Sequence, residues 1–273
     1  ALLEGVITVM EPGELGNKGS VVDAGLVAAM LGIMDQTQVQ DALTPEMAED
    51  LAGKMSASDV GLLDSDSAAA MMSTMGAETA ATAMEADSLA SMIGVMDGEA
   101  IAQTLDAESA GAIAQALTGE NLEGLGAEQA AGIATAMDPD QLAALDADQA
   151  AGMATAISAE PDQLLEMDSE SVAAMATTME ASDMGALGSD MVGTMMAAMD
   201  SEQLGGMSDE HMAEALETTG ADHMGAGAAN FDEIEAAATF LSEAPVETPE
   251  SFAEMMQAEG AASFFSGMFG GES

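Results

Sequence analysis

The sequence predicts an all-α protein: an α-solenoid of about nine repeats of about 20 residues, each formed by two short helices, with divergent N- and C-terminal caps. Apolar residues return at a fixed period, which is typical of repeat architectures. Helix-cap residues and prolines return between the apolar clusters. Hydrophobic residues make up 48% of the 273 residues, which argues against disorder.

The repeat is clearest in two successive segments, TGENLEGLGAEQAAGIATAM at 118–137 and DPDQLAALDADQAAGMATAI at 138–157. A helical repeat domain is therefore expected over 23–219, between an N-terminal arm or cap at 1–22 and a Phe-containing cap and apolar tail at 220–273. The other repeats are 35–55, 56–75, 76–96, 97–117, 158–179, 180–199 and a degenerate 200–219, after a half-repeat at 23–34.

Each repeat ends in an apolar residue with another four residues earlier, and this spacing puts both on one face of a helix. A third apolar column, twelve residues before the end, predicts a separate, shorter helix. The end column is Met34, Met55, Met75, Met96, Leu117, Met137, Ile157, Met179 and Met199. The column four residues earlier is Met30, Leu51, Met71, Met92, Ile113, Ile133, Met153, Met175 and Met195. The shorter helices supply Leu43, Leu63, Met84, Leu105, Leu125, Leu145, Met167 and Leu187.

Cap residues separate the two helices of a repeat. Asp106, Asp146 and Asp168 are placed to cap the second helix, and Asp138 with Gln141 has capping-box spacing. Helices this short are marginal alone, so neighbouring helices must stack. We expect one layer per repeat, about 8–10 Å apart.

The charge restricts the partners. Asp and Glu number 50 against two basic residues, Lys18 and Lys54, which gives a formal charge of −48. Nucleic acids and anionic membranes need a basic surface and are excluded. Cations or a basic protein surface remain as partners, and the self-repulsion favours ion-rich surroundings such as seawater, brine or a calcium-loaded cell surface.

The sequence offers few indications of location. It contains no Cys, and no apolar run reaches the roughly 18 residues of a transmembrane segment. The first residue, Ala1, fits removal of a secretory signal, which predicts an extracellular or cell-surface protein. Removal of an initiator Met before Ala would leave the same residue.

Both ends differ from the repeats. Leu2 to Met10 has β character and is expected either to fold over the first helices or to pair with another subunit. The tail at 260–273 is apolar and is expected to dock on another copy or a partner, or to pack on its own repeats. The predicted assembly interface is Leu2, Leu3, Val6, Ile7, Val9, Phe264, Phe265 and Phe269.

Metal sites are predicted only in a weak form. Pairs of aspartates could bind Ca²⁺ diffusely through oxygen ligands, although none matches an EF-hand loop, and no other cofactor is expected. The 27 Met residues suggest Cu(I), but Leu or Ile replaces Met in the same columns, which favours packing. His211 and His223 allow a modest transition-metal site or are surface residues. The calcium candidates are Asp64, Asp66, Asp138, Asp140, Asp146 and Asp148.

No nucleophile elbow, Cys nucleophile or phosphate-binding loop is present, so an enzyme is not expected. The leading hypothesis is an extracellular structural protein that self-assembles as a filament, sheath or surface layer through its unlike ends, with a cation-dependent acidic surface. The alternatives are an acidic solenoid adaptor for a basic protein, possible inside a halophile, and an acidic calcium-binding or mineral-matrix protein.

Overall fold

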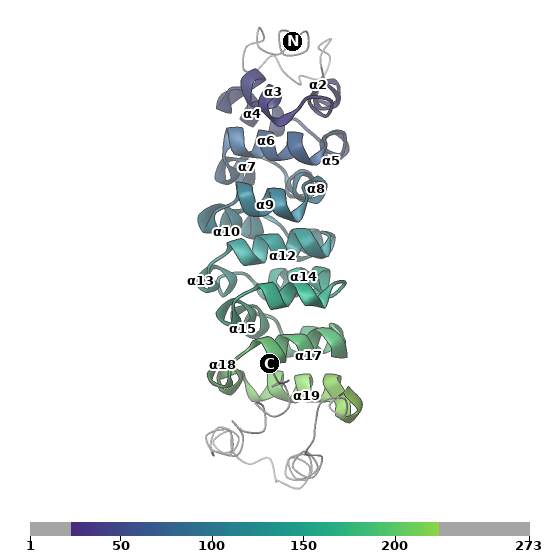
Figure 1. Ribbon diagram of the computed structural model, residues 1–273, viewed down its shortest axis with the longest axis vertical. Coiled ribbons are helices and arrows are strands. Elements are labelled where there is room, and N and C mark those ends of the chain that lie inside the picture. Colours follow the sequence, from purple (N-terminus) through teal and green to yellow (C-terminus); the bar gives the residue numbers. More distant parts are fainter. Residues whose placement is uncertain (1–22, 224–273) are drawn as a thin grey trace, which may run out of the picture. The chain divides into compact units, whose positions relative to one another are not determined.

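The computed structural model describes residues 23–223, and within them the chain is helical with no strand. The helices belong to two compact units, 23–179 and 180–223. Figure 1 shows the helices of both. The first contains α2 (Ala24–Leu31), α3 (Gln36–Ala42), α4 (Pro45–Ala52), α5 (Ala57–Val60), α6 (Ser65–Met75), α7 (Ala77–Ala83), α8 (Ala86–Val95), α9 (Gly98–Thr104), α10 (Ala107–Ala116), α11 (Gly119–Glu123), α12 (Ala127–Ala136), α13 (Pro139–Leu142), α14 (Ala147–Ile157), the 3-10 helix η1 (Pro161–Glu166) and α15 (Ser169–Thr178). The second contains α16 (Ala181–Ala186), α17 (Ser189–Ala198), α18 (Ser201–Gly206) and α19 (Asp209–His223).

The predicted apolar columns form the core. Every residue of the end column is buried, and so are Leu51, Met71 and their later equivalents in the column four residues earlier. Two positions were predicted wrongly. Met30 is half-buried because α2 is the first described helix and has no described layer below it. Leu187 is half-buried, and Met184 is the buried residue of α16.

The predicted caps are confirmed at the start of the longer helices. Asp106, Asp146 and Asp168 each accept a hydrogen bond from the backbone N–H three residues later, at 2.7–2.9 Å. Gln141 Oε1 accepts from Asp138 N at 2.9 Å, as a capping box requires. Pro45 and Pro139 begin α4 and α13, where the missing N–H costs no intrahelical bond.

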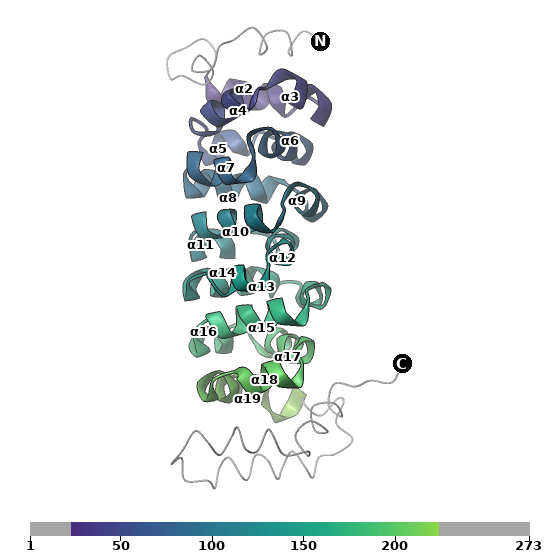
Figure 2. The ribbon, with the colours of Figure 1, turned by 90° about the vertical axis from the view of Figure 1, so that its left-hand side faces the viewer.

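The sequence predicted one layer per repeat, and this prediction was wrong. In the first unit, every helix from α2 to α13 except α10 packs on the third helix after it, so a layer holds three helices, or one and a half repeats. Figures 1 and 2 show the successive helices. Three rows result in the first unit. The α2 row is α2, α5, α8, α11 and α14; the α3 row is α3, α6, α9, α12 and η1; the α4 row includes α4, α7 and α10. In the second unit α16 and α17 pack on α19.

Buried polar side chains join successive layers. The third residue of a longer helix donates to a carbonyl 32–36 residues earlier. This carbonyl lies at or just after the end of an earlier helix, before the start of the helix that packs below the donor helix. These bonds leave no buried side-chain nitrogen or oxygen without a partner in the described residues. The donors are Ser67 Oγ to Leu31 O at 2.8 Å, Ser88 Oγ to Met55 O at 3.0 Å, Gln129 Nε2 to Met96 O at 2.9 Å and Gln149 Nε2 to Leu117 O at 2.7 Å.

Candidate binding cleft

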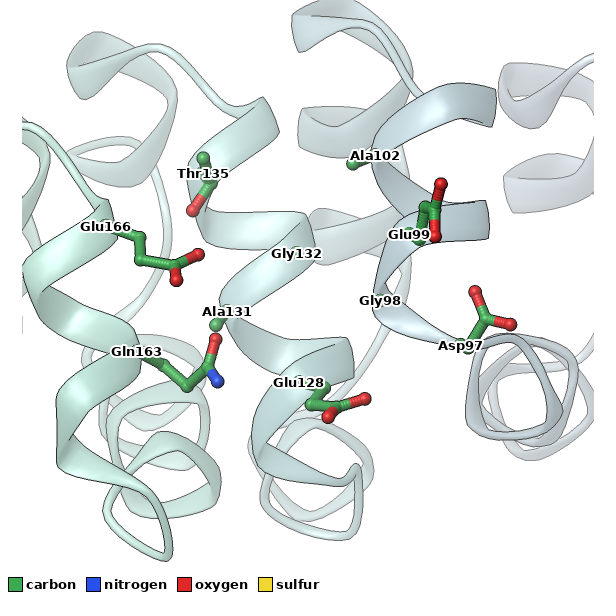
Figure 3. Close-up of a pocket in the computed structure, with 10 residues that line it drawn as sticks. All are labelled: Asp97, Gly98, Glu99, Ala102, Glu128, Ala131, Gly132, Thr135, Gln163 and Glu166. Carbon is green, nitrogen blue, oxygen red and sulfur yellow. The ribbon is translucent and has the colours of Figure 1, made fainter.

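An acidic cleft of about 510 Å³ runs along three successive members of the α3 row, α9, α12 and η1 (Figure 3). Four carboxylates and two other polar side chains line it, around small residues from α9 and α12. The lining residues are Asp97, Gly98, Glu99, Ala102, Glu128, Ala131, Gly132, Thr135, Gln163 and Glu166.

The small residues let α9 and α12 approach closely. A Cβ atom on Gly98 would lie 3.2 Å from the carbonyl oxygen of Glu128, and one on Gly132 would lie 3.2 Å from Cγ2 of Ile101. Larger side chains at either glycine would push the two helices apart. The close approach therefore brings the carboxylates of α9 near the first turn of α12, where Glu128 lies (Figure 3).

The other side of the cleft is formed by η1, the irregular member of the row. Its repeat, 158–179, is longer than the preceding one, 138–157, and the short helix begins at Pro161 without a side-chain cap. Glu160, before it, has φ −139° and ψ 76°. Gln163 and Glu166 lie on this segment and line the cleft opposite α9 (Figure 3).

The carboxylates of the cleft accept few hydrogen bonds from other groups of the protein. Asp97 accepts from Ala100 N at 2.7 Å and from Ser65 Oγ at 3.2 Å, and Glu99 accepts from Gln103 Nε2 at 3.0 Å. All four carboxylate side chains are exposed, and no basic residue lines the cleft. The arrangement concentrates negative charge around a floor of Gly and Ala, which suits a cationic group.

The six aspartates predicted to bind calcium are all exposed and are not gathered into one group. Asp64 and Asp146 cap α6 and α14 through backbone N–H groups. Within residues 23–223, no group of three or more His, Asp or Glu side chains is arranged to hold a metal ion. Diffuse calcium binding stays a prediction.

Sequence reasoning did not find the cleft. Asp97, Glu99 and Glu128 were not among the candidate residues, because the 20-residue period does not show which helices lie side by side. The sequence does contain a signal for which helices lie side by side: the column of Ser and Gln at the third position of the longer helices. A buried donor there needs a carbonyl from another layer, and that requirement points to helices one and a half repeats apart.

Apart from Met30, the methionines of the repeat columns are buried, and so are, apart from Leu187, the Leu and Ile residues that replace Met in the same columns. Ser208 Oγ and His211 Nδ1 lie 2.5 Å apart at the start of α19, whereas the side chain of His223 lies outside the described part of the chain, so the predicted pair is untested.

Both predicted end domains, 1–22 and most of 220–273, also lie outside the described residues, together with the whole predicted assembly interface. The described helices include none with the length and apolarity that a membrane span requires.

Comparisons with protein-family models, curated protein sequences and solved structures found no match to this chain.

Proposed function

We propose that this chain is an α-solenoid of about nine two-helix repeats that works as a non-enzymatic scaffold and binds a cationic segment of a partner protein. The observation that carries the proposal is the cleft along α9, α12 and η1, which four carboxylates line without a basic residue among them. Arg is the best-matched partner side chain, because its planar guanidinium can bond two carboxylate oxygens at once.

The charge of the whole chain supports the same role. At −48, the long-range field steers a cationic partner toward the protein at low ionic strength. The exposed carboxylates contribute little singly, about 0.2–1 kcal/mol for each ion pair, so affinity must come from several pairs made together. Binding should therefore weaken steeply as salt rises above about 0.1 M, where the screening length falls below roughly 10 Å.

The proposal is tested with a fluorescent Arg-rich peptide and a variant that neutralises two carboxylates of the cleft, Glu128→Gln with Glu166→Gln. Loss of two ion pairs predicts roughly 2- to 30-fold weaker binding in fluorescence anisotropy. The matched control is Glu120→Gln with Glu123→Gln, which removes the same charge from exposed positions of α11. Equal weakening in both variants would mean that the peptide binds the general surface charge and not the cleft.

Self-assembly into an extracellular filament, sheath or surface layer is a separate proposal. The observation in its favour is the apolar tail, with Phe264, Phe265 and Phe269, on so acidic a chain. Electron microscopy with calcium and then with chelator tests it: ordered assemblies that dissolve on chelation support carboxylate-bridged contacts, and single particles in both conditions contradict it.

A further inference from the structure

The first described helix, α2, has apolar residues on two faces. Val27, Ala28 and Leu31 face the core. Leu26 and Met30 lie four residues apart on another face of α2, and Ile33 follows in the turn after the helix. Leu26 is 47% and Ile33 73% exposed. A helix that is apolar all round is normally buried all round.

The later long helices of the same row show what covers this face in the interior. Met92 of α8 and Met153 of α14 stand where Met30 stands in α2, and both are fully buried. At the position of Leu26, α8 has Ser88 and α14 has Gln149. These two side chains donate to carbonyl groups of the layer below.

The third position of the helix is Ser in α8 and Gln in α14 but Leu in α2. This difference indicates which kind of side chain packs over α2. Inside the stack, the preceding layer offers a helix-end carbonyl, and a donor is needed opposite it. Leu26 can satisfy no carbonyl. The element over α2 must therefore present apolar side chains.

We propose that residues Leu2–Met10 of the same chain cover the face formed by Leu26, Met30 and Ile33. This assignment goes beyond the proposed binding function, and it favours the folded-over arm over the exchanged strand. The segment is apolar, with Leu2, Leu3, Val6, Ile7 and Val9.

The connection is long enough for this contact. Residues 11–22 reach about 40 Å at roughly 3.3 Å per residue, whereas the eight residues of α2 span about 12 Å. A tether of this length holds the segment at an effective concentration of about millimolar, far above that of a second copy in dilute solution.

Disulfide trapping in the full chain tests the proposal, because the sequence contains no Cys. Thr8→Cys is combined with Ala29→Cys, at an exposed position of α2 that leaves the three apolar residues intact. Mild oxidation at micromolar protein should give a monomeric intramolecular disulfide at a rate independent of protein concentration. That rate should be at least about tenfold higher than in a control pair, given the millimolar local concentration.

The control combines Thr8→Cys with Ala144→Cys, which is also exposed but follows α13, several layers from α2 in the same compact unit (Figure 1). A disulfide-linked dimer whose yield rises with protein concentration would overturn the proposal in favour of a second copy. Equal rates in the two pairs would overturn it in favour of an unbound segment. A further variant, Leu26→Glu, should lower the trapping rate severalfold if the contact is apolar.

Discussion

Two copies of the tetrapeptide Pro-Asp-Gln-Leu fold differently in adjacent repeats. At 139–142 it forms the α-helix α13, and at 161–164 it begins the 3-10 helix η1. The first follows Asp138, whose N–H donates to Gln141. The second follows Glu160, whose N–H donates to Ile157 O instead. The two copies therefore differ in the residue that precedes the tetrapeptide, and the 3-10 form is the one that lines the cleft.

The largest expected loss of stability is at the buried leucines that end the two tetrapeptides. Leu142 and Leu164 are both fully buried. Leu142→Ala and Leu164→Ala should each lower the free energy of unfolding by about 2–5 kcal/mol, because each leaves a cavity. Urea denaturation followed by circular dichroism measures both. A much smaller loss at Leu164 would show that η1 is loosely packed.

The next comparison concerns Gly152 of α14 and Ala174, its counterpart in α15. A Cβ on Gly152 would come within 2.2 Å of the Gly119 carbonyl oxygen. Gly152→Ala should therefore cost about 1–3 kcal/mol in unfolding free energy. Helix propensity alone would give the opposite sign, a gain of about 1 kcal/mol, so denaturation of this variant separates a close helix contact from a merely permissive site.

A similar cost is expected at the bonds between layers. Gln149→Ala removes the donor to Leu117 O and should cost about 1–3 kcal/mol, because a buried carbonyl loses its partner. Ser171 is the matched position of the following repeat, and its hydroxyl donates to Asp168 of its own helix start. Ser171→Ala should cost about 1 kcal/mol or less. Equal losses in thermal denaturation would contradict a special role for the interlayer bond.

A smaller effect tests the cap itself. Glu160→Asp gives η1 a residue type that caps helices well and should raise the free energy of unfolding by about 0.5 kcal/mol. Hydrogen exchange of the Gln163 amide should slow in the same variant. Unchanged exchange would assign the 3-10 form to the greater length of this repeat rather than to its cap.

The smallest effect is the pH dependence at a well-formed cap. Hydrogen bonds from the side chain and backbone of Ser109 lower the pKa of Asp106 below its ordinary 3.8. A lowered pKa stabilises the fold above pH 3.8, and this contribution is lost as the pH falls through the folded-state pKa. Asp106→Asn, which still caps, should melt near the original temperature at pH 7 and lose less stability between pH 5 and 3. Parallel acid titrations followed by thermal melting check this.

The sequence predicted the helices and most of the core because each apolar column repeats with its own spacing and caps. It failed at Met30 because the first helix has no described layer below it to bury that face. The layering was not predictable from the period, since two helices per repeat do not say which helix lies on which. The cleft was missed for the same reason: Glu128 and Glu166 line one cleft only because α12 and η1 are neighbours in one row.

Stacking on every third helix has a consequence for the duplication of repeats in the gene. Duplicating one repeat adds two helices, or two thirds of a turn, and every later residue would then face a different side of the stack. Duplicating three repeats adds two whole turns and preserves every direction. Unequal crossing-over by one repeat therefore keeps the fold and redirects its surface, whereas only steps of three copy a cleft onto the same side.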